Sequence, residues 1–132
     1  MADGFDLNRL LIISAVLEKH AGLKLNTFDI FLNVSGGFNI NETAADLAVA
    51  MAVASSLKEK PIGEGAGFIG EISLSGELRP VSQVEKRVQE FRYSGFNRIF
   101  MSQGDLDRVK SSGFDGEFIG LKTVRDVMDR VF

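Results

Sequence analysis

The sequence contains no cysteine and only one histidine, His20. These absences exclude a disulfide, a site with thiolate ligands and a histidine cluster, so we expect no bound zinc or iron. The sequence also lacks a run of about 18 apolar residues and a basic leader with a small-residue cleavage site. A chain without cysteine suits a reducing compartment. We therefore expect a soluble, cytoplasmic protein that does not contact a membrane.

Neither sign of charge dominates the chain. It has 15 lysine and arginine residues against 18 aspartate and glutamate residues, which gives a formal net charge of −3. Such a chain has no overall attraction for nucleic acid, so a contact with nucleic acid would need a local basic patch. A length of 132 residues is enough to bury one core, and we expect a single domain over residues 1–132.

Three glycines, Gly65, Gly67 and Gly70, have the spacing G-x-G-x-x-G. In a dinucleotide-binding fold this motif follows a strand and opens a helix, whose N-terminus faces the pyrophosphate. Here a helix end and a proline-marked loop precede the glycines, and an alternating run with a turn at Ser75-Gly76 follows them. The glycines therefore indicate a loop that enters a strand and a tight turn. We expect no cofactor there.

The spacing of apolar residues predicts an alternation of helices and strands. Helices are expected over 6–21, 43–60, 82–94, 105–111 and 123–131. Strands are expected over 28–34, 69–74, 98–101 and 117–119, with a further short strand from 78. Capping boxes are expected at Thr43 with Asp46 and at Ser82 with Glu85, and Thr123 should cap the last helix. The alternation predicts a mixed α/β domain with helices packed on a sheet.

Few residues are candidates for catalysis on their own spacing. His20 could serve a Ser-His-Asp triad, but it lies near a helix C-terminus, where the helix dipole favours histidine for structural reasons. Glu42 and Asp46 are four residues apart, and helix capping explains both. A Ser-Lys dyad stays open, because serines and lysines are numerous and only geometry could identify a pair.

Two long segments resemble a known family. They are DIFLNVSGGFNINETAADLAVAMAVASSLKEKPI, residues 29–62, and GFIGEISLSGELRPVSQVEKRVQEFRYSGFNRIFM, residues 67–101. Both resemble the proteolytic domain of Lon and, more closely, the Lon-like C-terminal domain of the RadA (Sms) family of bacterial DNA repair and recombination proteins. The opening segment FDLNRLLIISAVLEKHAGLKL also resembles that domain, so the likeness runs over about residues 4–103. It implies a Lon proteolytic-domain-like fold, of the ribosomal protein S5 domain 2-like type.

The resemblance also implies that the proteolytic site is lost. The Lon nucleophile is the serine of a P-S-A-G motif, and the matching position here is Ala44. The Lon lysine lies in a G-G-L-K-E-K run, and the matching position here is Glu85. Lys86 follows one residue later, which turns its side chain about 100° around the helix. An alanine has no oxygen to activate, so this domain is expected to have no protease activity.

The resemblance to RadA also implies a parent protein and an assembly for this domain. The domain is expected to be an excised C-terminal part of a longer RadA-type protein, and to form a hexameric ring beneath a RecA-like ATPase that moves on DNA during branch migration. No P-loop motif G-x-x-x-x-G-K-[ST] and no four-cysteine module occurs in this chain. ATP and zinc are therefore expected only in absent parts of the parent protein. The exposed side of helix 82–94 and the loop 36–41 are the expected contacts between subunits.

DNA is the second expected partner. A local basic patch for it is expected in the helix and strand that follow Ser82, whereas the alternative is a solvated helix face that contains Glu85 and Glu90. The basic residues of the patch are Lys86, Arg87, Arg92 and Arg98.

Two other functions stay open. One is a Lon-like peptidase with a displaced dyad, for which Ser82 or Ser55 would act with Lys86 or Lys58. The other is a protein-binding adaptor.

Overall fold

A parallel three-stranded sheet lies at the centre of the protein. The computed structural model describes residues 2–3, 7–23, 32–33, 43–109 and 114–132. The sheet order is β3-β6-β7, with β3 spanning Ala66–Phe68, β6 Arg98–Ser102 and β7 Glu117–Leu121. Ala66 pairs with Arg98 and Arg98 pairs with Glu117, which fixes the register across all three strands. The mixed α/β class expected from the sequence is thus confirmed.

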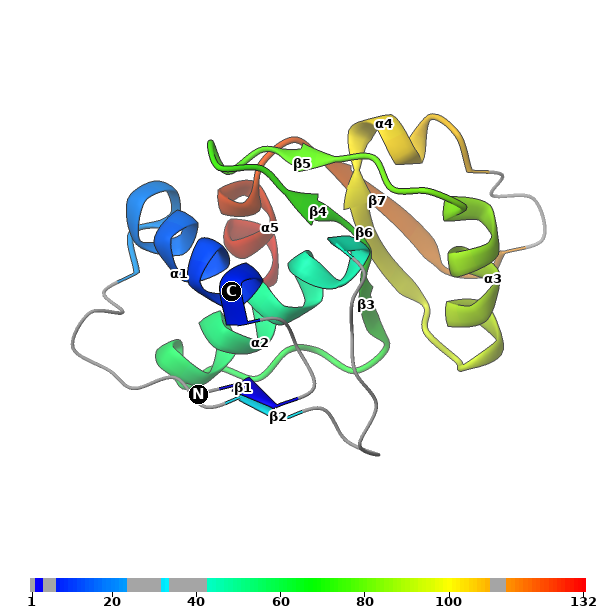
Figure 1. Cartoon of the computed structure of the whole chain (residues 1–132). Helices are drawn as coiled ribbons and strands as arrows, with labels where there is room; N and C mark the ends of the chain where they lie inside the picture. The colour runs from blue at the N-terminus through cyan, green and yellow to red at the C-terminus, as the bar shows by residue number, and fades with distance from the viewer. Residues whose placement is uncertain (1, 4–6, 24–31, 34–42, 110–113) are drawn as a thin grey trace.

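Helices cover both faces of this sheet (Figure 1). On one face lie α1, Leu7–Ala21, α2, Asp46–Lys58, and α5, Val124–Val131. On the other face lie α3, Val84–Tyr93, and the short α4, Gln103–Leu106. The side chains of β6 alternate between the two cores, because Phe100 packs with the α1, α2 and α5 side chains and Ile99 and Met101 pack with those of α3.

Smaller elements complete the fold. β4, Glu71–Ile72, and β5, Leu78–Arg79, form an antiparallel hairpin that turns at Gly76, whose φ is +85°. β1, Ala2–Asp3, pairs in parallel with β2, Leu32–Asn33. β2 falls within the strand expected over 28–34, and the rest of that strand lies outside the described residues. None of the helices in the described part of the chain is long and apolar enough to cross a membrane.

The glycine-rich stretch has the conformation expected from its context. β3 begins directly after Gly65, whose φ is +77°, and β4 begins directly after Gly70. A strand therefore stands where a dinucleotide-binding motif would open a helix. Of the strand expected over 69–74 only β4, Glu71–Ile72, forms, and Ile69 and Gly70 join it to β3. There Ile69 N–H donates to Phe100 O at 2.9 Å and Gly70 N–H donates to Ala44 O at 3.0 Å.

Both expected capping boxes are wrong. Thr43 belongs to a 3₁₀ turn, η2, Thr43–Ala45, and α2 begins after Ala45 without a side-chain cap. Asp46 does not cap because its carboxylate points to α1 and β4. α3 begins after Gln83, which has a φ of +55° and provides no side-chain cap either.

The expected cap of the last helix is confirmed, and another helix starts earlier than expected. Thr123 Oγ1 accepts the Asp126 N–H at 3.1 Å. The helix expected over 105–111 begins at Gln103, because Ser102 caps its N-terminus. It ends at Leu106.

Candidate functional site

A cleft of about 350 Å³ lies between the start of α2 and α3. Small side chains of η2 and α2 line the cleft together with Phe68 of β3 and Phe91 of α3. Arg87 and Glu90 of α3 add opposite charges to the lining. The small side chains are those of Ala44, Ala45 and Ala48.

Ala44 occupies a buried and well-bonded position in this cleft. Its side chain belongs to the apolar cluster that contains Val84 and Val88 of α3, and only 8% of the residue is exposed. Its carbonyl accepts the Gly70 N–H at 3.0 Å, while Gly70 O accepts the Leu47 N–H at 3.0 Å. These two bonds hold the start of α2 against the segment that joins β3 to β4. The position that the resemblance assigns to the Lon nucleophile is therefore a methyl group in an apolar environment.

Close to Ala44 in the chain, Asp46 is a buried carboxylate that accepts two hydrogen bonds. Arg9 donates to Asp46 Oδ2, and the Ile72 N–H donates to the same oxygen at 3.1 Å. Burial raises the pKa of Asp46, and the Arg9 hydrogen bond acts against that rise. The carboxylate thus links α1, α2 and β4, and a structural role explains it. Glu42, the other acid of the expected pair, lies outside the described residues.

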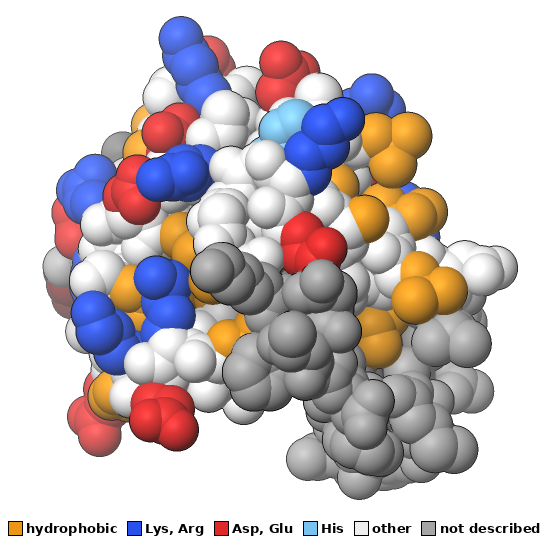
Figure 2. Space-filling model, turned by 90° about the vertical axis from the view of Figure 1, so that its left-hand side faces the viewer, with side chains coloured by type: hydrophobic (Ala, Val, Ile, Leu, Met, Phe, Trp, Pro, Cys, Tyr) orange, Lys and Arg blue, Asp and Glu red, His pale blue; other side chains and the backbone are white. Residues whose placement is uncertain are grey.

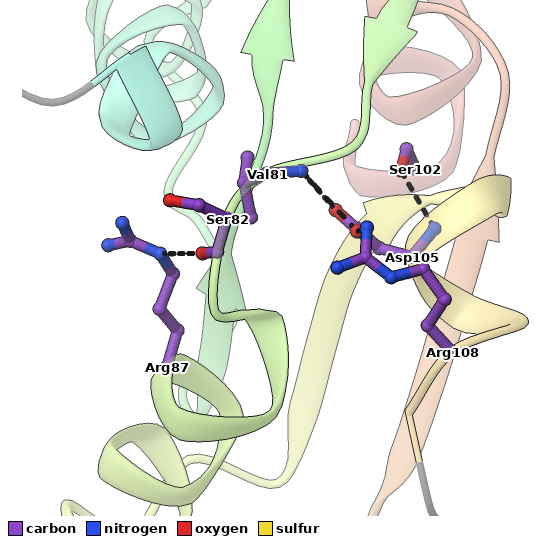
Figure 3. Close-up of polar contacts among 6 residues, drawn as sticks. All are labelled: Val81, Ser82, Arg87, Ser102, Asp105 and Arg108. Atoms are coloured by element: carbon purple, nitrogen blue, oxygen red, sulfur yellow. Dashed lines mark hydrogen bonds and ion pairs between the residues drawn. The ribbon is translucent and has the colours of Figure 1, made fainter.

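A second buried carboxylate, Asp105, holds the segment that leads into α3 (Figure 3). Its Oδ2 accepts the Val81 N–H at 3.1 Å, and its own N–H donates to Ser102 Oγ at 3.0 Å. Arg108 lies 3.3 Å from Asp105 Oδ1. Burial raises the pKa of Asp105, while the Val81, Ser102 and Arg108 contacts lower it. The start of α3 is thereby fixed relative to α4 and β6.

The serines and lysines of a displaced Ser-Lys dyad lie on or next to α2 and α3. Ser82 and Lys86 are both exposed, and the Ser82 carbonyl accepts Arg87 Nε at 2.9 Å. Ser55 lies in the last turns of α2, where its hydroxyl bonds the Lys60 carbonyl. A general base must lie within hydrogen-bond reach of its nucleophile, in a site that can hold substrate. His20 lies near the end of α1 and against the hairpin turn, 3.0 Å from the place where a Cβ on Gly76 would stand.

The four basic residues expected to contact DNA lie on α3 and β6 in different surroundings. Lys86 is exposed on the outer side of α3. Arg87 lines the cleft beside Ala44, whereas Arg92 lies over the Phe114 ring, with 5.2 Å from its guanidinium carbon to the ring centroid. Arg98, on β6, lies 3.4 Å from the carboxylate of Glu117. The structure therefore exposes Lys86, half-buries Arg92 against Phe114 and directs Arg87 toward the cleft.

Sequence reasoning missed Arg9 and Asp105 as buried polar contacts. Asp105 carried a detectable signal, because Ser102 and Asp105 have the S-x-x-D spacing of a capping box. Arg9 carried none, since its partner lies 37 residues away. Within the described residues, no group of three or more histidine, aspartate and glutamate side chains is arranged to hold a metal ion.

Comparison of the sequence with known proteins identifies a matching family and several relatives. The family model described as subunit ChlI of Mg-chelatase matches residues 10–105. The DNA repair protein RadA of Streptococcus pneumoniae is 41% identical over 129 residues, and that of Listeria monocytogenes is 42% identical over 130 residues. RadA of Bacillus subtilis is 41% identical over 129 residues. These alignments cover 97–98% of this chain and 28–30% of each relative.

The class that the fold defines is thus a mixed α/β domain, and its relatives are DNA repair proteins. The chain belongs to the family described as subunit ChlI of Mg-chelatase and is homologous to RadA. The resemblance to RadA is confirmed. The chain spans less than a third of the length of the RadA relatives that it matches.

Proposed function

We propose that this chain is a catalytically inactive, Lon-like domain that assembles into a ring and supports DNA binding in a RadA-type DNA repair protein. Homology to RadA supports the repair role. In this proposal the parent protein is a DNA-dependent ATPase of the cytoplasm that drives branch migration. Its ATP and zinc sites would lie outside this domain.

The environment of Ala44 is the observation that carries the inactive-scaffold proposal. Hydrolysis by a serine peptidase needs an oxygen nucleophile beside a base. At the position that matches the nucleophile, the chain has a buried methyl group packed with Val84 and Val88. Glu85, at the position that matches the lysine, has an exposed acidic side chain. At these two positions the chain therefore has neither of the groups that peptide hydrolysis would need.

The cleft also favours a second candidate function, a protein-binding adaptor. Its alanine and phenylalanine lining could hold an apolar side chain of a partner. This function differs from the leading proposal in that it requires no affinity for DNA. Measuring DNA binding therefore separates the two.

The experiment removes three positive charges from α3. Lys86→Ala, Arg87→Ala and Arg92→Ala are combined, and binding to a labelled duplex is measured by fluorescence anisotropy at several salt concentrations. If these side chains neutralise phosphates, affinity falls and the slope of log K against log salt becomes shallower by about 0.9 for each phosphate that the variant leaves unneutralised. The weakening should be similar for unrelated DNA sequences, because phosphate contacts carry no base information.

A matched control removes the same charge elsewhere. Lys58→Ala, Lys60→Ala and Arg130→Ala change three exposed residues at the ends of α2 and α5. This control should keep the native affinity and salt slope, because its residues lie outside the proposed surface. If both triple variants bind alike while circular dichroism shows intact folds, the basic residues of α3 are a solvated surface and the proposed DNA contact is wrong.

A further inference from the structure

Tyr93, in the last turn of α3, is an aromatic side chain left almost wholly in water. It is 92% exposed and is the only tyrosine in the sequence. Leu74 and Leu11, the other large apolar side chains exposed in the described part of the chain, are 74% and 59% exposed. An aromatic ring this exposed contributes little to the core, because it is hardly removed from water when the chain folds. Packing within the domain therefore does not explain it.

The surroundings of Tyr93 suit a nucleic acid strand. A hollow of about 400 Å³ is lined by Gln89, Arg92 and Tyr93. Arg92 lies over Phe114, which itself stacks on Phe118 at a centroid distance of 4.5 Å. This contact holds the guanidinium beside the exposed tyrosine on an aromatic support.

The exposed side of α3 extends this surface along the helix. Gln89 and Tyr93 are three and seven residues after Lys86, so the three side chains lie on one side of a helix with 3.6 residues per turn. All three are exposed. Two acids belong to the same helix, since Glu85 is exposed and Glu90 lines the cleft on the side of Arg87. The end of α3 near Tyr93 therefore combines an aromatic ring, an amide and a guanidinium.

We propose that Tyr93 stacks on an unpaired base of single-stranded DNA while Arg92 and Lys86 contact the flanking phosphates. The inference rests on the proposed DNA-binding function and names the form of DNA that this surface prefers. An aromatic ring beside cationic groups is an arrangement by which proteins hold single strands without reading their sequence. Bases inside a duplex are already stacked on their neighbours and offer no free face to Tyr93. The surface thus binds single strands more tightly than duplexes.

The single tyrosine makes the contact directly measurable. The chain has no tryptophan, so its intrinsic fluorescence comes mainly from Tyr93. Titration of the whole chain with an oligo(dT) strand is expected to quench this fluorescence as base and ring stack. A matched control combines Tyr93→Phe with Leu74→Tyr, which moves the fluorophore to the exposed hairpin and keeps a ring on α3. The control should show only the decrease in signal caused by absorption of light by the DNA.

Affinity measurements test whether the stacking contributes to binding. With a dye-labelled oligo(dT), Tyr93→Ala should weaken binding between about 5-fold and about 150-fold, and Tyr93→Phe should keep nearly native binding because the ring remains. Binding of Tyr93→Ala to duplex DNA should change little. The variant should therefore lose most of the preference for single strands, and circular dichroism should show an unchanged fold because Tyr93 is exposed.

The results separate this inference from the proposed function. If DNA binds in a manner that depends on Lys86 and Arg92, yet Tyr93→Ala binds single strands as tightly as the native chain, stacking is wrong and the basic surface stands. Quenching no larger than that of the Leu74→Tyr control would also overturn stacking. If neither single strands nor duplexes bind at low salt, both the stacking and the proposed DNA contact are overturned.

Discussion

Asp105 shows how one buried side chain can position a surface that it does not itself form. Its carboxylate accepts the Val81 N–H, and its backbone N–H bonds Ser102. Val81 lies three residues before α3, the helix to which both proposals assign DNA contacts. Removing the carboxylate with Asp105→Ala would leave the Val81 N–H buried without an acceptor, which costs about 1–3 kcal/mol. Urea unfolding of the variant measures this decrease in the free energy of unfolding.

The raised pKa of Asp105 leads to a prediction about pH. Burial lifts this pKa above its ordinary value of 3.8. Between the unfolded and the folded pKa the native state therefore binds more protons than the unfolded state, and stability falls as pH rises through that window. In Asp105→Asn this carboxyl is absent, while the amide oxygen can still accept the Val81 N–H. Urea unfolding from about pH 3 upward should thus show a smaller decrease of stability with rising pH in the variant.

The native chain is the reference for that comparison. Asp46, whose pKa is also raised by burial, stays in both proteins and contributes equally to both curves. The difference between the curves therefore isolates Asp105. Parallel curves for the native chain and Asp105→Asn would contradict the assigned environment of this carboxyl.

At the scale of elements, helix ends were harder to predict than helix faces. The apolar spacing of α1, α3 and α5 was enough to predict them, because burial of one face follows directly from a 3.6-residue period. The capping boxes at Thr43 and Ser82 had the right spacing, yet neither forms. The Asp46 carboxylate accepts a hydrogen bond from Arg9 instead, a partner 37 residues away. Local spacing carries no information about such distant competition.

Two threonines allow a direct test of the observed caps. Thr123 Oγ1 accepts the Asp126 N–H at 3.1 Å, whereas α2 has no side-chain cap from Thr43. Thr123→Ala should lower the free energy of unfolding by about 1 kcal/mol, because α5 loses a bonded N–H. Thr43→Ala should change it by less than about 0.5 kcal/mol. Urea denaturation of the two variants gives both values, and an equal decrease in each would show that Thr43 caps α2 after all.

At the scale of the whole molecule, the mixed α/β class was predictable but the strand order was not. Alternating helices and strands indicated a sheet with packed helices. Nothing in the spacing states that β6 lies between β3 and β7, since that order depends on pairing between segments far apart in the sequence. The family resemblance drew attention to Ala44, but the cleft that Ala44 lines was not predicted. The exposed ring of Tyr93 drew no attention in the sequence, because exposure is a property of the folded chain.

The outer surface of the molecule also bears on the proposed ring. Figure 2 shows apolar side chains gathered at one edge of the face that it presents. Leu11 of α1 and Leu74 of the hairpin are exposed, and Leu74 lines a hollow of about 400 Å³ with Ile12 and Arg79. Exposed apolar side chains that gather in one region are a feature of contacts between subunits. We therefore assign one side of the proposed subunit contact to this region, while the loop 36–41 lies outside the described residues.

Self-association through this region should depend on concentration and on the two leucines. Light scattering of the native chain is expected to show a rising mass as concentration increases, and Leu11→Ser with Leu74→Ser is expected to stay closer to the monomer mass. Lys58→Ser with Lys60→Ser serves as the control, because it also shortens two exposed side chains but lies at the end of α2, outside the leucines and helix 82–94. Equal masses for the native chain and the leucine variant at every concentration would contradict the assignment.

Mixing the proteins distinguishes a ring contact from a symmetric dimer. In a ring each subunit uses two different faces, so the leucine variant keeps the face that meets the leucine side of a neighbour. The variant should then bind native chains at one end and stop further growth, and a small proportion of it should lower the average mass disproportionately. In a symmetric dimer both partners present the same leucines, so the variant would be excluded and native dimers would persist. Light scattering of mixtures at constant total concentration separates these outcomes, and a mass that falls only in proportion to the variant added would contradict the ring.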